Sequence, residues 1–416
     1  MQHDCTLPEL ATRAEDIARV AYGRLLAILA ARDGDIEAAE DALADAFLRA
    51  LQTWPRSGVP ENPSAWLLAT ARHRRIDAQR AAAHRLTGSL DDAARGDALP
   101  AIHLADVGEI PDRRLALLFV CAHPAIDPAA RTPLMLQVVL GFDADRIARA
   151  FAMQPAAMAQ RLVRAKRRIR EARIPFAVPE RERMNERLTP VLEAIYGAYA
   201  IEFPLVGGIA ERESLAAEAH YLAATLAELL PEQPEALGLA ALIALSLARR
   251  RARGDGEAFV PLDEQDVAHW DHELIASGEL LLRRASAQKR PGRYQTEAAI
   301  QAVHCDRARS GTTDWRALRA LYGALLEFAP TLGARVALAA AIGRTEGAHA
   351  GLDSLDAIAG EAVLRFQPAW ATRAHLLEAA GLKPDAVIAF DRAISLTTDQ
   401  RSRAYLQRRR DGLELA

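Results

Sequence analysis

The sequence predicts an all-α protein with two small helical modules, the second a helix-turn-helix, an acidic linker between them, and a C-terminal helical-repeat domain. Alanine, leucine and arginine, which favour helices, dominate the 416 residues. Alternating runs rich in valine, isoleucine and threonine, which would indicate strands, are scarce. Half of the residues are hydrophobic and 26% are charged, so the chain can bury a core, and its length allows two or three domains.

The composition excludes several classes of protein. The net charge of −3 means that any nucleic-acid site must be a local basic patch. Cys5, Cys121 and Cys305 lie far apart and form no C-x-x-C motif, which argues against a disulfide framework or a cysteine zinc site. The N-terminus lacks an apolar signal-peptide core, and the longest apolar stretch, 236–248, is shorter than the roughly 20 residues of a membrane span. We therefore expect a cytoplasmic protein that does not bind a membrane.

Residues 10–85 are expected to form the first module. Gly34 interrupts a first helix, and a second helix begins near Asp35. A break at 54–60 precedes a third helix, for which Ser64 is the expected N-cap. The third helix has a basic face with five candidate nucleic-acid ligands: Arg72, His73, Arg74, Arg75 and Arg80.

Two tryptophans and an acidic run accompany this basic helix. Trp54 and Trp66 could stack on a nucleic-acid strand, but core packing is the simpler interpretation for Trp66. The stretch 33–45 contains acids and no base, so it repels DNA and suits either a basic protein partner or water. Its acids are Asp33, Asp35, Glu37, Glu40, Asp41 and Asp45.

Residues 86–111 are predicted to be a flexible acidic linker. They show no apolar period and combine glycines with five acids and one arginine up to position 110. These acids are Asp91, Asp92, Asp97, Asp106 and Glu109. The simplest interpretation is a solvated tether.

The second module, residues 112–174, contains the most specific pattern in the chain. A helix through 134–140 ends at Gly141, and Asp143 is the expected cap of a short helix that buries Ile147 and Phe151. A brief turn then leads to Pro155, which favours the first position of a helix. Two short helices with this spacing are typical of a helix-turn-helix.

The last helix of this module is expected to read DNA. Its apolar residues recur at helical spacing and should face the core: Met158, Leu162, Ala165 and Ile169. Residues 155–173 also carry seven bases and one acid, a density that attracts phosphates and can read base edges. The candidate DNA ligands are Gln160, Arg161, Arg164, Lys166, Arg167 and Arg168. A charge run without the preceding turn and helix would more simply be a solvated face.

Residues 186–416 are predicted to form a third, helical part. Within 371–396, small residues alternate with large ones in the manner of a tetratricopeptide helix pair, where small side chains let two helices pack closely. An ordinary irregular helical domain is the alternative. Nothing indicates catalysis or a cofactor, since no phosphate-binding, nucleophile-elbow or zinc-protease motif is present. His269 and Glu273 would share a helix face, but no third metal ligand is evident.

Residues 10–174 resemble an extracytoplasmic-function sigma factor of the sigma-70 family. The segment DALADAF at 41–47 resembles region 2.2, and 63–80 resembles regions 2.3 and 2.4. The segments 147–151 and 157–170 resemble region 4.2. The rest of the chain resembles the subgroup with a C-terminal tetratricopeptide-like extension, through motifs such as LDEQD at 262–266.

This resemblance implies a set of roles. Asp41, Asp45 and Phe47 would bind core RNA polymerase, whose clamp helices and flap such factors contact. The basic helix of the first module would face the minus-10 promoter element, and the reading helix of the second would face the minus-35 duplex. The linker would thread toward the polymerase cleft, and the extension would regulate activity, through a regulatory protein partner among other routes.

Two departures and two alternatives stand beside this interpretation. His73 occupies a position where asparagine is expected, and 197–204 lacks the expected Asn-Glu-Gly-Tyr sequence. One alternative is a stand-alone helix-turn-helix regulator with a ligand- or protein-sensing helical domain. The other is a scaffold whose repeats carry the function.

Overall fold

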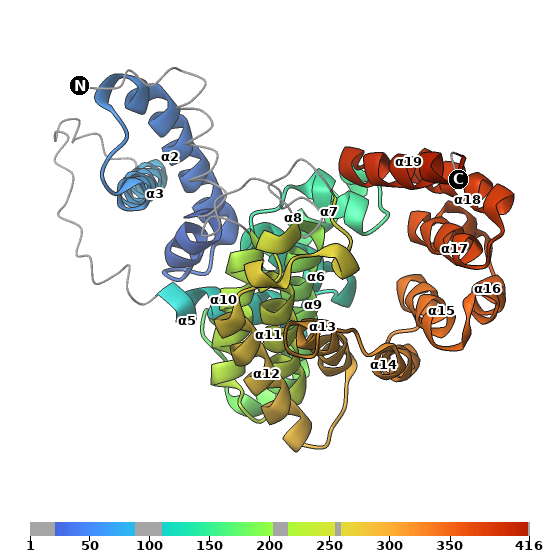
Figure 1. The fold of residues 1–416 in the computed structure, drawn as a ribbon. Coiled ribbons are helices and arrows are strands. Elements are labelled where there is room, and N and C mark those ends of the chain that lie inside the picture. Colours follow the sequence, from blue (N-terminus) through green and yellow to red (C-terminus); the bar gives the residue numbers. More distant parts are fainter. Residues whose placement is uncertain (1–20, 88–109, 203–214, 254–258, 415–416) are drawn as a thin grey trace. The chain divides into compact units, whose positions relative to one another are not determined.

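The computed structural model describes residues 21–87, 110–202, 215–253 and 259–414. These described residues form helices and connecting turns and contain no strand, which confirms the prediction of an all-α protein (Figure 1). The chain divides into two compact units, and the described part of the first comprises residues 21–202 with 215–226. The described part of the second comprises 227–414. Residues 10–20 and most of the predicted linker lie outside the described residues.

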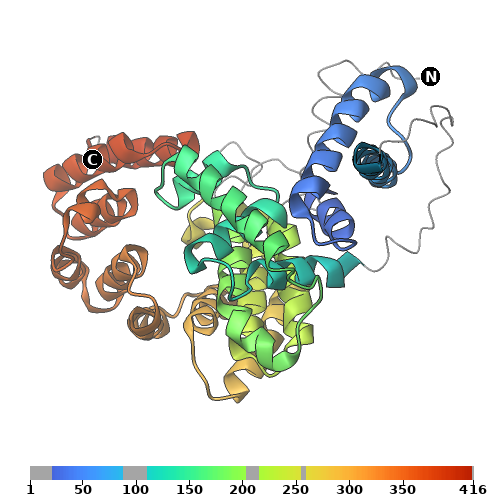
Figure 2. The same ribbon diagram turned by 180° about the vertical axis from the view of Figure 1, so that it is seen from behind.

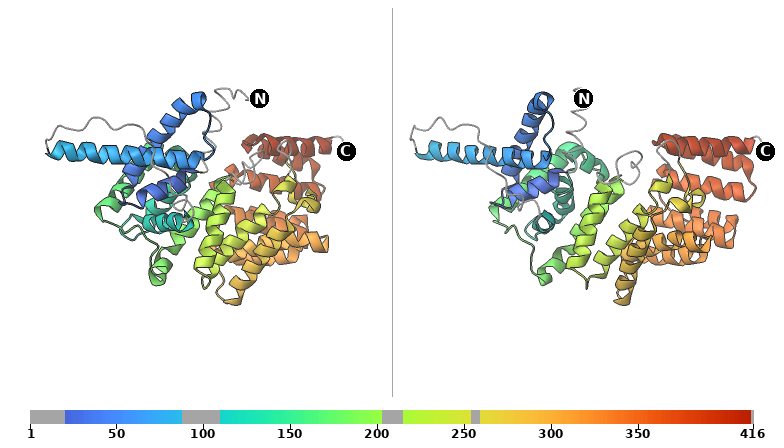
Figure 3. Two further views of the ribbon diagram at one scale, coloured as in Figure 1. Left: turned by 90° about the vertical axis from the view of Figure 1, so that its left-hand side faces the viewer. Right: turned by 60° about the vertical axis from the view of Figure 1, so that its left-hand side comes forward.

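The first unit begins with a helix at 21–30 and continues through the elements predicted for both modules. Its further helices are α2 (Ile36–Ser57), α3 (Pro63–Thr87), α5 (Ile110–Cys121), α6 (Pro128–Val138), α7 (Ala144–Ala150), α8 (Pro155–Glu171), α9 (Arg181–Glu202) and most of α10 (Leu215–Leu229). Helix α2 crosses the long α3, which Figure 3 shows along its length. Helix α6 packs against α5 and α8 of the second module and also against α9, most of which belongs to the predicted third part of the chain.

Local sequence accounts for the helix starts in the first module. The Asp35 carboxylate accepts the Ala38 N–H at 3.1 Å and caps α2, as the sequence predicts. The predicted cap of α3 was wrong, because the helix already begins at Pro63 and the Asn62 side chain accepts the Ala65 N–H at 3.0 Å. Trp54 is buried, and its ring meets the half-buried Trp66 edge-on at 5.5 Å, so both tryptophans contribute to packing.

The second unit consists of helices, most of which are linked by short turns. Its helices are α11 (Pro234–Leu247), α12 (His272–Ala287), α13 (Arg293–Ser310), α14 (Trp315–Phe328), α15 (Leu332–Glu346), α16 (Ala348–Asp356), α17 (Gln367–Ala379), α18 (Lys383–Leu396) and α19 (Gln400–Glu414). Short 3-10 turns at 251–253, 262–264, 267–269 and 361–365 connect some of them. Helices α13 to α19 follow one another around an arc, as Figures 1 and 2 both show. No helix within the described ranges is long and apolar enough to cross a membrane.

Helix α11 is the centre of the second unit, since it packs against both α12 and α13. It is apolar on every side and buried over nearly its whole length. Its Glu235 carboxylate accepts the backbone N–H groups of Tyr294 at 2.9 Å and Gln295 at 3.1 Å. The start of α13 has no side-chain cap of its own, so a carboxylate from another helix satisfies it. A Cβ at Gly292 would lie 2.4 Å from the Glu235 carboxyl carbon, so a larger residue there would displace this carboxylate.

Small residues allow the later helices to approach closely. A Cβ on Gly351 of α16 would lie 2.8 Å from the Gly343 Cα of α15, so these two backbones touch. Between α17 and α18, buried alanines pack beside Leu377 and the fully buried Phe390. This packing agrees with the small-and-large spacing of 371–396. The predicted face shared by His269 and Glu273 does not form, because α12 begins only at His272.

The buried His304 on α13 makes the stability of the second unit dependent on pH. Burial, and then the charges of Arg249 and Arg307, lower the pKa of His304 to about 3, whereas an unfolded histidine has a pKa of about 6.5. The unfolded chain therefore binds more protons below about pH 6.5, and stability falls as the pH decreases, by up to about 1.4 kcal/mol per pH unit. Urea midpoints measured by circular dichroism between about pH 7 and pH 5 should fall less steeply for His304→Phe than for the wild type. Equal slopes would contradict the assignment.

Candidate nucleic-acid interface

Helices α7 and α8 form the helix pair that the sequence predicts. Gly141 adopts a φ of +71° after α6, and the Asp143 carboxylate accepts the Arg146 N–H at 2.7 Å to cap α7. Pro155 occupies the start of α8, also as predicted. The expectation that Phe151 is buried was wrong: its side chain is 40% exposed because α7 ends at Ala150 and the chain turns away there.

Helix α8 has one apolar side and one polar side. Its buried apolar residues are those predicted: Met158, Leu162, Ala165 and Ile169. Four of the predicted DNA ligands lie exposed along the helix: Gln160, Arg164, Arg167 and Arg168. The half-buried Arg161 reaches the Met153 sulfur and the Ala129 carbonyl, both at 3.4 Å. The exposed side therefore offers guanidinium and amide groups to phosphates and base edges.

Lys166, the sixth predicted DNA ligand on this helix, lies on the buried side. Only 9% of its surface is exposed, and its Nζ donates to the Glu40 carboxylate at 2.6 Å. Glu40 belongs to α2, so this ion pair joins the two predicted modules. The sequence held a signal for this burial, because Lys166 lies four residues after the buried Leu162, on the same helix face.

The acidic run at 33–45 is largely occupied by bases of the same unit. Arg170 of α8 lies 2.8 Å from Glu37 and 3.7 Å from Asp35. Arg74 of α3 pairs with Asp45 at 2.6 Å. The sequence suggested either a separate basic partner or water for this run, and the structure shows intramolecular arginines and a lysine instead.

The predicted basic face of α3 is divided between surface and structural roles. Arg74 and Arg80 are exposed, whereas Arg72 and His73 are half-buried. Arg75 is 8% exposed and donates to the Leu29 carbonyl and to the Asp33 carboxylate. These bonds fix α3 against the helix at 21–30 and the turn that follows it, so Arg75 stabilises the packing of the first module.

The surface predicted to bind polymerase also contains an apolar stripe that was not predicted from the sequence. Of the three predicted residues, Asp41 is exposed, while Asp45 and Phe47 are half-buried. Leu48 and Leu51 on the same helix are 57% and 48% exposed. Asp41, Ala44, Leu48 and Leu51 follow one another at intervals of three and four residues and so share one face of α2. An exposed leucine pair beside an acid is a surface suited to a protein partner.

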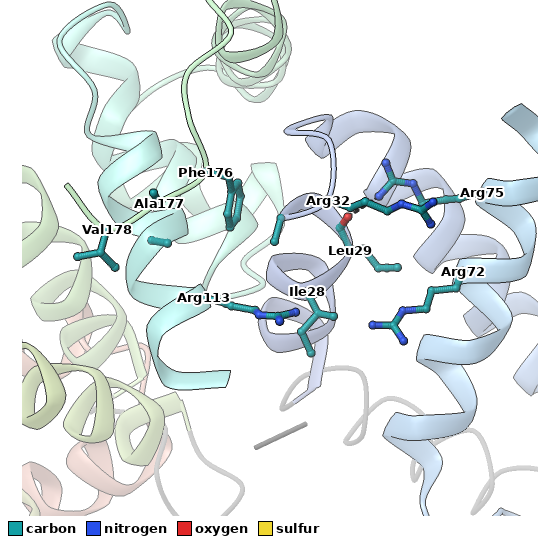
Figure 4. A pocket seen from close by; sticks show the side chains of 11 residues that line it. Ile28, Leu29, Arg32, Arg72, Arg75, Arg113, Phe176, Ala177 and Val178 are labelled. Atoms are coloured by element: carbon teal, nitrogen blue, oxygen red, sulfur yellow. Dashed lines mark hydrogen bonds between the residues drawn. The ribbon is translucent and has the colours of Figure 1, made fainter. Parts of the chain in front are cut away.

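A cavity of about 620 Å³ adjoins the basic face of α3 within the first unit (Figure 4). Four arginines and no acid from the described residues line it: Arg32, Arg72, Arg75 and Arg113. Apolar side chains, among them Ile28 and Phe176, complete the wall. This combination favours an anionic group that also carries an apolar or planar part.

Comparison with known proteins agrees with this geometry. Sigma-70 region 2 matches residues 17–85, which include α2 and nearly all of α3. This match to region 2 supports membership of the sigma-70 family. This assignment carries the role of that family, which is to act with RNA polymerase in transcription initiation at promoter DNA.

The remaining comparisons extend the relationship without adding a function. An uncharacterized protein of Rhizobium meliloti (strain 1021) is 35% identical over 390 residues, which cover 91% of this chain and 90% of that protein. A family of unknown function, DUF6596, matches residues 187–286 of this sigma-70 family member. No solved structure matches the chain.

Exposed arginines on α8 should determine how strongly this sigma-70 family member binds duplex DNA. We expect Arg164→Gln with Arg168→Gln to weaken binding and to make the slope of log K against log salt less steep by about 2, since each phosphate contact contributes about 0.9. Fluorescence anisotropy with a labelled duplex at several salt concentrations measures both quantities. The matched control, Arg283→Gln with Arg309→Gln in the second unit, should change neither. An equal effect of both pairs would refute a specific role for α8.

Proposed function

We propose that this chain is an extracytoplasmic-function sigma factor that directs core RNA polymerase to promoters with two spaced elements. The observation that carries the proposal is the two-sided α8. A buried apolar stripe fixes this helix, and Gln160, Arg164, Arg167 and Arg168 point to solvent downstream of a sigma-70 region 2. In this role α8, with Arg161, contacts the minus-35 duplex. Lys166 joins these contacts only once it is released from Glu40.

The first module takes the other two tasks in this proposal. The α2 stripe, comprising Asp41, Ala44, Leu48 and Leu51 with Asp45 and Phe47 beside it, docks on the clamp helices. The basic face of α3 meets the minus-10 DNA through Arg74 and Arg80, with Arg72 and His73 at its edge. The exposed leucines support docking on polymerase, because a regulator that binds DNA alone gains nothing from them.

The C-terminal unit is proposed to control the factor as a tetratricopeptide-like regulatory domain. Closely packed helix pairs such as α15–α16 and α17–α18 support this assignment, since arrays of this kind present extended surfaces to proteins and peptides. The polymerase performs the chemistry, so the factor itself needs no catalytic group or cofactor.

Transcription in vitro tests the proposal. Cognate core polymerase, the full chain and a library of upstream DNA are combined, and transcript starts are mapped. Starts that depend on the protein and share two spaced motifs would establish a sigma factor. Specific duplex binding without any association with core polymerase would instead establish the stand-alone regulator.

The exposed leucines of α2 should be essential for docking. We expect Leu48→Asp to weaken binding to core polymerase at least about tenfold, because an apolar anchor at the centre of an interface contributes about 2 kcal/mol or more. Pull-down with core polymerase and biolayer interferometry measure the loss, and duplex binding by α8 should persist. Leu280→Asp in the second unit is the control, since Leu280 is 53% exposed, like Leu48 at 57%. Unchanged docking by Leu48→Asp would rule out this face.

A further inference from the structure

The cavity beside α3 differs from two cavities of similar size in the second unit by the sign of its charges. One of those, about 540 Å³, is lined by arginines and acids together, and its Arg309 pairs with Glu279 at 2.7 Å and with Asp306 at 2.9 Å. The other, about 510 Å³, is mainly apolar and contains the Arg373–Asp356 pair. The cavity beside α3, about 620 Å³, has four arginines and no acid among its described lining residues. Its interior is therefore positive.

Separate segments of the first unit supply the walls of this cavity. Arg72 and Arg75 come from α3, and Arg113 comes from α5. Arg32 lies in the turn after the helix at 21–30, and Phe176 lies in the segment that follows α8. In Figure 4, the side chains of Arg72 and Arg113 extend toward the helix at 21–30 from opposite sides. A ligand in this space would be reached by guanidinium groups from several directions.

Arg75 belongs to the wall of the cavity rather than to its binding groups. It is 8% exposed, and it donates to the Leu29 carbonyl and to the Asp33 carboxylate. These bonds hold its guanidinium in place, and the carboxylate balances its charge. Ligand binding is therefore assigned to the other three arginines of the wall, which are exposed or half-buried: Arg32, Arg72 and Arg113.

This set of arginines favours a ligand with more than one phosphate. A guanidinium group presents a planar fork of donors that can form two parallel hydrogen bonds to a carboxylate or a phosphate. A single carboxylate has two oxygens, so one arginine can occupy both of them. Arginines from three different segments exceed that capacity, whereas a di- or triphosphate carries more acceptor oxygens and more charge.

The apolar part of the wall favours a flat ring beside these phosphates. Phe176 is half-buried, and Figure 4 shows its ring on the side of the cavity that faces the helix at 21–30. Ile28, which is buried, projects from that helix into the same cavity. A nucleic-acid base can stack on an aromatic side chain whatever its identity, because every base has a π-face. The volume also lies within the range of small-molecule sites, about 300–1,000 Å³.

We propose that this cavity binds a free nucleotide with two or more phosphates. The phosphates lie on Arg32, Arg72 and Arg113, and the base packs against Phe176. Magnesium is usually held at such sites by one or two carboxylates together with the phosphates, and no acid among the described residues lines this cavity. The arginines therefore neutralise the phosphates directly, and binding does not require magnesium. The site depends neither on promoter binding by α8 nor on docking of α2.

Fluorescent N-methylanthraniloyl derivatives of GTP and ATP are the probes, added to the full chain in buffer with EDTA. We expect fluorescence anisotropy to show saturable binding of both, with a Kd well below about 1 mM. Unlabelled GTP should displace the probe. GMP, guanosine and inorganic tripolyphosphate should each compete at least about tenfold less well, because each lacks part of the phosphate chain or the base.

Variants in the wall separate the two halves of the ligand. Arg113→Gln should weaken GTP binding about tenfold, since it removes a charge-assisted hydrogen bond and does not alter the proposed DNA and polymerase surfaces. Phe176→Ala should weaken GTP binding about tenfold and leave competition by tripolyphosphate unchanged, because only stacking is lost. Phe176→Tyr, which keeps the ring, should bind GTP like the wild type. Arg283→Gln is the matched control, because Arg283 lines the cavity of about 540 Å³.

Several results would overturn the proposal. The first is a Kd above about 1 mM for both probes, and the second is an equal effect of Arg113→Gln and Arg283→Gln. Competition by tripolyphosphate that matches GTP would show a site for phosphate chains alone. A single strand of about ten nucleotides that binds more tightly than GTP, and less tightly to Arg113→Gln, would assign the cavity to a DNA strand instead. None of these results bears on transcription in vitro, so the proposed sigma factor role stands or fails separately.

Discussion

The ion pair between Lys166 and Glu40 is the interaction on which the arrangement of the first unit depends. A lysine ammonium that is 9% exposed needs a partner of opposite charge, because burial without one costs several kcal/mol. Among the described residues, the acid that pairs with Lys166 is Glu40 of α2, which belongs to a different predicted module. Helix α8 is therefore fixed on one side by its own apolar stripe and on the adjoining side by a charge from α2. The exposed arginines keep their orientation because both of these sides are occupied.

The other acids of the run 33–45 also form ion pairs within the first unit. Arg75 pairs with Asp33, and Arg74 pairs with Asp45. Arg170 pairs with both Asp35 and Glu37. The sequence predicted that these acids face a protein partner or water, but in the structure they serve as counter-ions for bases on α3 and α8. Leu48 and Leu51 remain exposed on α2, between Asp41 and the polar residues of its last turn. A docking surface of this kind relies on burial of apolar area, which salt screens far less than it screens exposed charge pairs.

Local rules in the sequence predicted the elements well and the fate of charged side chains poorly. Asp35, Gly141, Asp143 and Pro155 act within one turn of their own positions, so the starts and ends they predict agree with the structure. The helical spacing places Lys166 on the buried face, but the acids that pair with Arg75 and Lys166 lie 42 and 126 residues away, and no local pattern identifies these partners. The same holds for Glu235, which caps a helix that begins almost sixty positions later. Even the missed Asn62 cap reflects competition between two good capping residues rather than a failure of the rule.

A nearly neutral chain can bind a polyanion only if it separates its charges in space. With a net charge of −3 over 416 residues, the field at α8 depends on how close the acids of α2 lie to it. Coulomb energy falls with distance and with solvent screening, so moving Glu37 and Glu40 away by more than about 10 Å would nearly abolish their effect at physiological salt. The distance between the acids of α2 and helix α8 therefore determines the electrostatic potential at α8. The glutamates that pair with Lys166 and Arg170 therefore reduce the positive field of α8, and the exposed Arg164 and Arg168 contribute to the field that remains.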